Sequence, residues 1–324
     1  MITTITKRAW TVSRGLTVLT LLNVFILIAS IIGRISDSTV ANGVSVWDKP
    51  AKFALSFLAF GPALLWLFSH VESTKLIRRG LGALGWSMVV EIALIFMQSV
   101  RGTTSHFNKS TTFDSAVYRG MSVGVSVFAL AGVITGVVLA RKKLGTNAVA
   151  LATKLAVIMM TAGALLGFAM TRTMEGQVEG GDTIGSHTIG AADSGVGIPF
   201  LGWSTEFGDL RVAHFLGLHS LHVIPLTALT VMWLTRRQTV DLNDRGQRRV
   251  TALAAVAYGG LVITTFVQAL RSIPFTSPDT NTWTTLFFLA LTPAFAAVLV
   301  ALRPTANLKA SSDAYVEPAP TARH

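Results

Sequence analysis

Hydrophobic residues fall into eight long segments separated by short polar stretches. The segments cover residues 16–33, 50–70, 80–101, 116–140, 150–171, 210–235, 249–271 and 282–302. About 20 helical residues cross the roughly 30 Å of bilayer hydrocarbon, and each segment is close to that length. The sequence therefore predicts an all-α, polytopic membrane protein with eight transmembrane helices and with both termini on the same side.

The composition agrees with this fold class. Hydrophobic residues make up 51% of the 324 residues and charged residues only 13%, whereas soluble domains carry about 25% charged residues. The formal net charge of +11 does not indicate nucleic acid, because the basic residues lie in short clusters between apolar segments and form no continuous basic face. We expect the lipid bilayer as a partner and no nucleic acid. The absence of cysteine excludes disulfides and thiolate chemistry.

The distribution of basic residues predicts the orientation. With the N-terminus inside, eighteen of the 27 lysines and arginines fall in the inner segments, as the positive-inside rule requires. We expect a bacterial inner (cytoplasmic) membrane protein with cytoplasmic termini. The first apolar segment is too long for a cleaved signal peptide, so we expect an uncleaved helix. Residues 305–324 are rich in Ala, Ser and Pro, which predicts a disordered cytoplasmic tail.

Two stretches of the chain resemble each other. Residues 96–101 read Phe-Met-Gln-Ser-Val-Arg and residues 266–271 read Phe-Val-Gln-Ala-Leu-Arg. The similarity predicts a 4+4 parallel internal repeat, with a first four-helix half at 1–145 and a second half at 146–304 that contains a long outer loop at 173–208. The alternative is that apolar helices ending in Gln and Arg match by chance.

Three histidines lie in the sixth apolar segment. His214, His219 and His222 fall on one side of a helix with 100° per residue. Ionisable side chains inside a membrane segment usually face protein and mark a functional site. Glu91, in the third segment, is expected near the depth of His222, and we predict that the two side chains pair.

Further polar residues are expected at the same outer end. His106 lies in a polar turn at 102–108, and His187 lies in the glycine-rich loop, which we interpret as a lid. The turn is alternatively a hydrated connector, and the polar stripe of the third helix is alternatively a network of helix-to-helix hydrogen bonds without a ligand. The ligand-binding candidates are Lys52, Gln98, Arg101, Arg211, Gln268 and Arg271, with Lys49 beside them.

Two classes of function fit these residues. The first is a site that binds a metal or haem for membrane-associated redox chemistry, with His106, His214, His219 and His222 as metal ligands and with His222 and Glu91 as catalytic proton carriers. His219 and His222 can hold one ion together, but His214 and His222 lie about 12 Å apart along the axis and cannot. The alternative is a proton-coupled transporter or receptor for a small anionic ligand. A subunit that serves another membrane protein is a third possibility.

Overall fold

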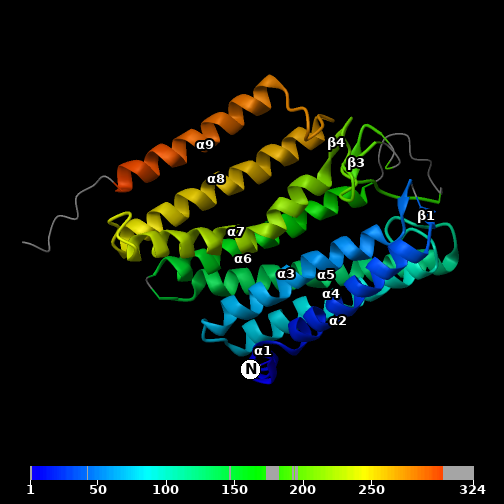
Figure 1. The fold of residues 1–324 in the computed structure, drawn as a ribbon, viewed down its shortest axis with the longest axis horizontal. Coiled ribbons are helices and arrows are strands. Elements are labelled where there is room, and N and C mark those ends of the chain that lie inside the picture. The colour runs from blue at the N-terminus through cyan, green and yellow to red at the C-terminus, as the bar shows by residue number, and fades with distance from the viewer. Residues whose placement is uncertain are drawn as a thin grey trace, which may run out of the picture.

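The computed structural model is a bundle of long helices that lie roughly side by side (Figure 1). It describes residues 2–41, 43–145, 147–172, 182–191, 193 and 196–301, with side chains described from residue 7 to residue 300. The expected disordered tail at 305–324 lies outside the described residues, and so does the first part of the glycine-rich loop, at 173–181.

Eight helices in the described part of the chain are long and apolar enough to cross a membrane. This confirms the expected all-helical, multi-pass architecture, and the observed bounds lie close to the expected ones. The helices are α2 (Arg14–Ser36), α3 (Asp48–Ser69), α4 (Lys75–Val100), α5 (Thr112–Arg141), α6 (Ala148–Leu166, followed by a 3-10 turn at Gly167–Thr171), α7 (Leu210–Arg236), α8 (Asp244–Leu270) and α9 (Thr280–Ala301).

Polar side chains define where most of these helices begin. A helix start leaves backbone N–H groups without partners, and a Ser, Thr, Asn or Asp side chain can accept a hydrogen bond from one of them. Ser13 does this for α2 and separates it from a short helix that the hydrophobic pattern did not predict, α1 (Ile2–Val12). The other capping residues are Thr74, Thr111, Asn147, Asp209 and Asn243.

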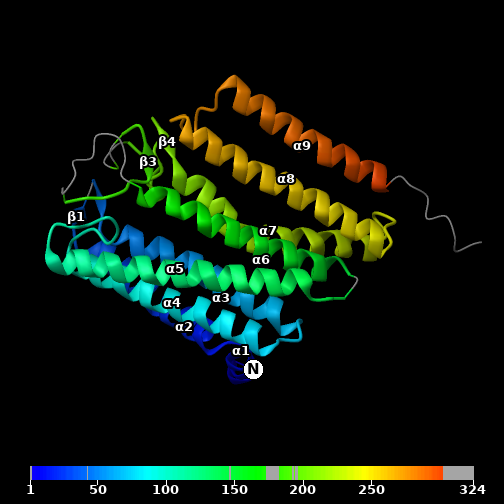
Figure 2. The same cartoon turned by 180° about the vertical axis from the view of Figure 1, so that it is seen from behind.

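In the described residues, two short antiparallel β-ladders lie at one end of the bundle. The strand β1 (Val40–Ala41) pairs with β2 (Val44–Ser45), and β3 (Thr188–Ile189) pairs with β4 (Gly208–Asp209). The labels of β1, β3 and β4 gather at the same end in both views (Figures 1 and 2), and we call it the strand end. Helices α3, α5, α7 and α9 begin there, and α2, α4, α6 and α8 finish there.

Glycine contacts bring two helix pairs close together. A Cβ on Gly217 of α7 would lie 2.4 Å from the backbone of Gly163 on α6, and a Cβ on Gly85 of α4 would lie 2.4 Å from the backbone of Gly15 on α2. Small residues let membrane helices approach in this way. Helix α9, in contrast, packs mainly on α8 at the outer edge of the bundle (Figure 1) and keeps most of its large apolar side chains exposed.

Candidate functional site at the strand end

The start of α3 is fixed by the chain that precedes it. The indole of Trp47 packs directly against Gly33, since a Cβ on Gly33 would lie 2.4 Å from the ring. The indole Nε1 donates a hydrogen bond of 2.8 Å to Asp37. Arg34 of α2 pairs with Asp48 at 3.1 Å. Because these contacts hold the first turn of α3, the lysines that follow Asp48 have a defined position at the strand end.

Lys49 and Lys52 lie one turn apart on α3 and therefore project from neighbouring positions on the helix. The ammonium group of Lys52 donates a hydrogen bond of 3.1 Å to the carbonyl of Leu201 and lies 6.0 Å from the ring centre of Phe200. Lys49 is partly buried and has no hydrogen bond or ion pair among the described residues. The charged groups near enough to act on Lys49 are Lys52, Glu91, Arg211 and Asp193.

Glu91 of α4 is 2% exposed and faces the turn between α4 and α5. Its Oε1 lies 3.2 Å from Nε2 of His106, although the two atoms are poorly aligned for a hydrogen bond. Gly124 of α5 lies beside the carboxylate, since a Cβ there would be in ordinary van der Waals contact with Oε2 at 3.5 Å. The predicted pairing of Glu91 with His222 is therefore wrong: the partner of Glu91 is His106.

His106 is held in a turn whose next residue, Phe107, has a positive φ of 62°. Its Nδ1 lies 3.0 Å from the hydroxyl of Ser105. Burial and the positive charge of Lys49 lower the pKa of His106, while the Glu91 carboxylate opposes that change. The imidazole is therefore uncharged at neutral pH, and protonating it would place a new positive charge beside Lys49.

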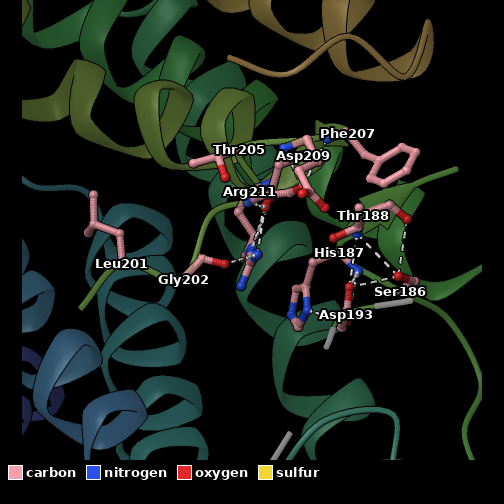
Figure 3. A network of polar contacts seen from close by, with 12 residues as sticks. Ser186, His187, Thr188, Asp193, Leu201, Gly202, Thr205, Phe207, Asp209 and Arg211 are labelled. Carbon is pink, nitrogen blue, oxygen red and sulfur yellow. Dashed lines mark hydrogen bonds and ion pairs between the residues drawn. The ribbon is translucent and has the colours of Figure 1, made fainter. Parts of the chain in front are cut away.

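His187 forms a second pair of an imidazole with a carboxylate (Figure 3). Its Nδ1 donates to Asp193 at 2.6 Å, and Asp193 also accepts from the Ser186 hydroxyl at 2.7 Å and from the backbone N–H of Thr188 at 3.0 Å. Burial lowers the pKa of His187 to about 4 despite the aspartate beside it. Burial would raise the pKa of Asp193, but the hydrogen bonds from His187 and Ser186 hold it below its ordinary value.

The β3–β4 ladder brings this pair to the start of α7. Thr188 is paired with Asp209, and the N–H of Leu210 donates to the carbonyl of His187 at 3.0 Å. Asp209 is 1% exposed and caps α7. It also accepts three hydrogen bonds from the Arg211 guanidinium, which donates to the carbonyl of Gly202 as well (Figure 3). Arg211 is therefore already paired, and it fastens the loop at Gly202 to the helix.

His214 is oriented by α6. Its Nδ1 lies 2.8 Å from the carbonyl oxygen of Gly163, and the ring fits beside Gly167, where a Cβ would lie 2.9 Å from it. Because a carbonyl oxygen only accepts, Nδ1 carries the hydrogen and Nε2 keeps its lone pair. Protonation of His106 would disfavour a proton on His214, so the two imidazoles lie in the same region.

His219 and His222 form a separate aromatic stack further along α7. The ring centre of His219 lies 4.0 Å from that of Phe215 and 5.0 Å from that of His222. Both ring nitrogens of His222 are buried without a hydrogen-bond partner among the described residues. The structure therefore does not join these two histidines to Glu91.

Four of the expected ligand-binding residues instead connect helix ends. Gln98 and Arg101, at the end of α4, contact Asp114 in the first turn of α5 at 2.9 and 2.6 Å. Gln268 donates to the carbonyl of Pro274 at 2.8 Å, and Arg271 pairs with Asp279 at 2.7 Å. Among the described residues, no hydrogen bond or ion pair joins these four side chains to the lysines or histidines above.

The structure thus gathers seven side chains from α3, α4, α7 and two loops, and we call them the strand-end cluster. Asp193 is the member that the sequence did not indicate, because loop residues carry no periodicity that would reveal a partner for His187. The members of the strand-end cluster are Lys49, Lys52, Glu91, His106, His187, Asp193 and Arg211.

The described residues contain no group of three or more His, Asp or Glu side chains placed to hold a metal ion. The expected ligand set of His106, His214, His219 and His222 is divided between the strand-end cluster, the α6 contact and the aromatic stack. No family model, no curated protein and no solved structure matches the chain.

Proposed function

We propose that the strand-end cluster binds a small anionic molecule. The observation that supports this is a pair of lysines, one turn apart, that have no ion-pair partner among the described residues. Four nearby carboxylates have partners in Arg34, Arg211, His187 and His106, whereas Lys49 and Lys52 have no carboxylate within ion-pair distance among the described residues.

Two partly buried ammonium groups one turn apart repel each other, and an anion between them removes that repulsion. Hydrogen bonds from ammonium to carboxylate or phosphate are among the stronger ones in proteins, because both partners are charged. The segment at Phe200 and Leu201 lies against Lys52 and covers part of its side chain. A small carboxylate or phosphate compound is therefore the ligand class that we propose.

We further propose that ligand binding is coupled to proton exchange. His106 and His187 each lie beside a carboxylate and close to Lys49. A bound anion would lower the electrostatic cost of protonating either imidazole. This is the behaviour expected of a proton-coupled transporter or receptor, in which His219 and His222 would carry protons further into the membrane.

The proposed orientation puts the strand end outside the cell, because the opposite end carries fifteen of the 24 basic residues in the described part of the chain. The chain lacks cysteine, so single cysteines report this directly. A membrane-impermeant maleimide applied to intact cells is expected to label Ser277→Cys, in the α8–α9 loop, and not Thr239→Cys, in the α7–α8 turn. The reverse pattern would show that the orientation is inverted.

The binding proposal is tested by thermal unfolding of purified protein with a panel of small anions, such as succinate, citrate, phosphate and sulfate. At least one anion is expected to raise the unfolding temperature of the native protein and not that of Lys49→Gln. Lys109→Gln is the matched control, because Lys109 is exposed at the same end. An equal response in all three proteins would exclude binding at Lys49.

A second candidate, metal or haem binding for redox chemistry, is favoured by one contact. The hydrogen bond from His214 to Gly163 orients the ring in the way that a backbone carbonyl commonly orients a metal-ligating histidine. A stoichiometric metal, or a haem Soret band, that is lost in His214→Ala and in His106→Ala would support this candidate over the anion site.

We also propose the 4+4 parallel repeat as the origin of the fold. The ion pair of Arg101 with Asp114 corresponds to that of Arg271 with Asp279, although Gln98 contacts Asp114 and Gln268 contacts the carbonyl of Pro274. Helix packing corresponds too, since α2 contacts α3 and α4 as α6 contacts α7 and α8. An experimental structure in which the two sets of four helices do not superpose would refute the repeat.

A further inference from the structure

A basic hollow lies at the end of the bundle opposite the strand end, where α8 begins beside the first turn of α6. Its volume is about 580 Å³. Leu151 of α6 and Ala252 of α8 contribute apolar walls, and the polar lining comes from the first turns of α8. The hollow is remote from the strand-end cluster and has no role in the proposed function.

The charge around the hollow is positive. Three arginines and one aspartate line it: Arg245, Arg248, Arg249 and Asp244. Arg245 and Arg249 are four residues apart, so they lie on the same face of α8. Both are exposed, and neither has a carboxylate within ion-pair distance among the described residues. Two like charges at this spacing repel each other until an anion lies between them.

The position of the hollow identifies the kind of anion. Both α6 and α8 have the length and hydropathy of membrane spans, so their first turns lie near one membrane surface. Trp233, at the end of α7 and half exposed, has the guanidinium of Arg237 5.5 Å from its ring centre. Tryptophan and basic residues together are typical of the headgroup layer. A phosphate at this level with apolar walls below it matches the chemistry of a phospholipid.

We propose that the hollow between the starts of α6 and α8 binds the headgroup of an anionic phospholipid through Arg245 and Arg249. The lipid phosphate lies between the two guanidinium groups, and an acyl chain follows the apolar surface of Leu151 and Ala252. Basic pockets between transmembrane helices recognise anionic headgroups in this way.

The test is native mass spectrometry of the full chain, delipidated and titrated with phosphatidylglycerol or with phosphatidylcholine. One phosphatidylglycerol per chain is expected to bind more tightly than the rest. Arg245→Gln with Arg249→Gln is expected to weaken that binding roughly 30-fold. The matched control is Lys75→Gln with Arg79→Gln, which removes two exposed charges with the same spacing from the start of α4 and is expected to leave the tight lipid bound.

Equal losses in the two double variants would overturn the proposal, because general surface charge would then explain the binding. Equal affinity for phosphatidylcholine would overturn it as well. Competition by inorganic phosphate at lipid-like concentrations would assign the hollow to a soluble anion instead. If the glutamine double variant does not fold, Arg245→Lys with Arg249→Lys serves in its place, and tight phosphatidylglycerol binding must then persist.

Discussion

Helices α3 and α7 both begin at the strand end, but the charged side chains in their first turns differ in whether they are paired. At α3, Asp48 pairs with Arg34, whose side chain is 61% exposed, and the lysines that follow have no carboxylate partner in the described part of the chain. At α7, Asp209 is buried, caps the helix and is paired with Arg211, and the ionisable residues that follow on the helix are histidines. The start of α3 therefore carries lysines that can bind an anion. The start of α7 stabilises the fold through its buried ion pair and carries side chains that can accept protons.

We expect the largest difference between the two helix starts when Asp209 and Asp48 are replaced one at a time and the loss of stability is compared. Asp209→Ala leaves Arg211 without its partner and α7 without its cap, and breaking a buried pair costs about 3 to 5 kcal/mol. Asp48→Ala breaks an exposed pair and should cost less than about 1 kcal/mol. Thermal unfolding in detergent measures both. Similar losses for the two variants would contradict the distinction between a structural α7 start and a loosely paired α3 start.

Protonation of His187 at acidic pH should lower the free energy of unfolding. Its pKa is about 4 in the folded protein against about 6.5 in an unfolded chain, so the unfolded state binds the proton first. Stability should therefore be complete above pH 6.5 and fall between pH 6.5 and 4, by about 3 kcal/mol at most. His187→Gln should flatten this dependence, although it also removes a hydrogen bond to Asp193.

His70→Gln is the control for the pH experiment, because His70 is exposed at the opposite end of the bundle. It should keep the native pH dependence of the unfolding temperature. If His70→Gln flattens the curve as much as His187→Gln does, the acid sensitivity does not come from the loop beside α7.

Replacing a glycine by alanine on α7 and on α3 tests which of the two helices packs more tightly against its neighbour. A Cβ on Gly217 of α7 would meet backbone atoms of Gly163, whereas a Cβ on Gly61 of α3 would meet first the hydroxyl of Thr20, which can rotate. Gly217→Ala should therefore cost about 1 to 3 kcal/mol, and Gly61→Ala should cost less. Unfolding temperatures in detergent give the comparison, and a larger loss for Gly61→Ala would show that α3 has the tighter contact.

The sequence predicted the helices well because the length of an apolar segment is a property of consecutive residues. It predicted less of the site, because the turns between helices determine which polar side chains contact each other. Glu91 contacts His106 and not His222, since the chain after Arg101 turns through Gly102 and Phe107, both with positive φ. Asn or Gly commonly marks such a turn, but Phe107 gives no such signal.

The polar ends of α4 and α8 show a second limit. Gln98 and Arg101 lie on the helix and end that the sequence indicated, but Asp114 satisfies them from the next helix. A hydropathy pattern places a polar residue near the membrane surface and does not tell whether protein or ligand meets it. His187 illustrates the same limit, because its partner Asp193 lies in a loop.

The central claim is that the unpaired charge at the start of α3 binds an anion. Isothermal titration calorimetry with the most stabilising anion tests it directly, on the native protein, Lys49→Gln and Lys109→Gln. Loss of one charge-assisted hydrogen bond, about 1.5 to 3 kcal/mol, should raise the Kd of Lys49→Gln roughly 10- to 100-fold and leave Lys109→Gln unchanged. The same Kd in Lys49→Gln as in the native protein would contradict the account.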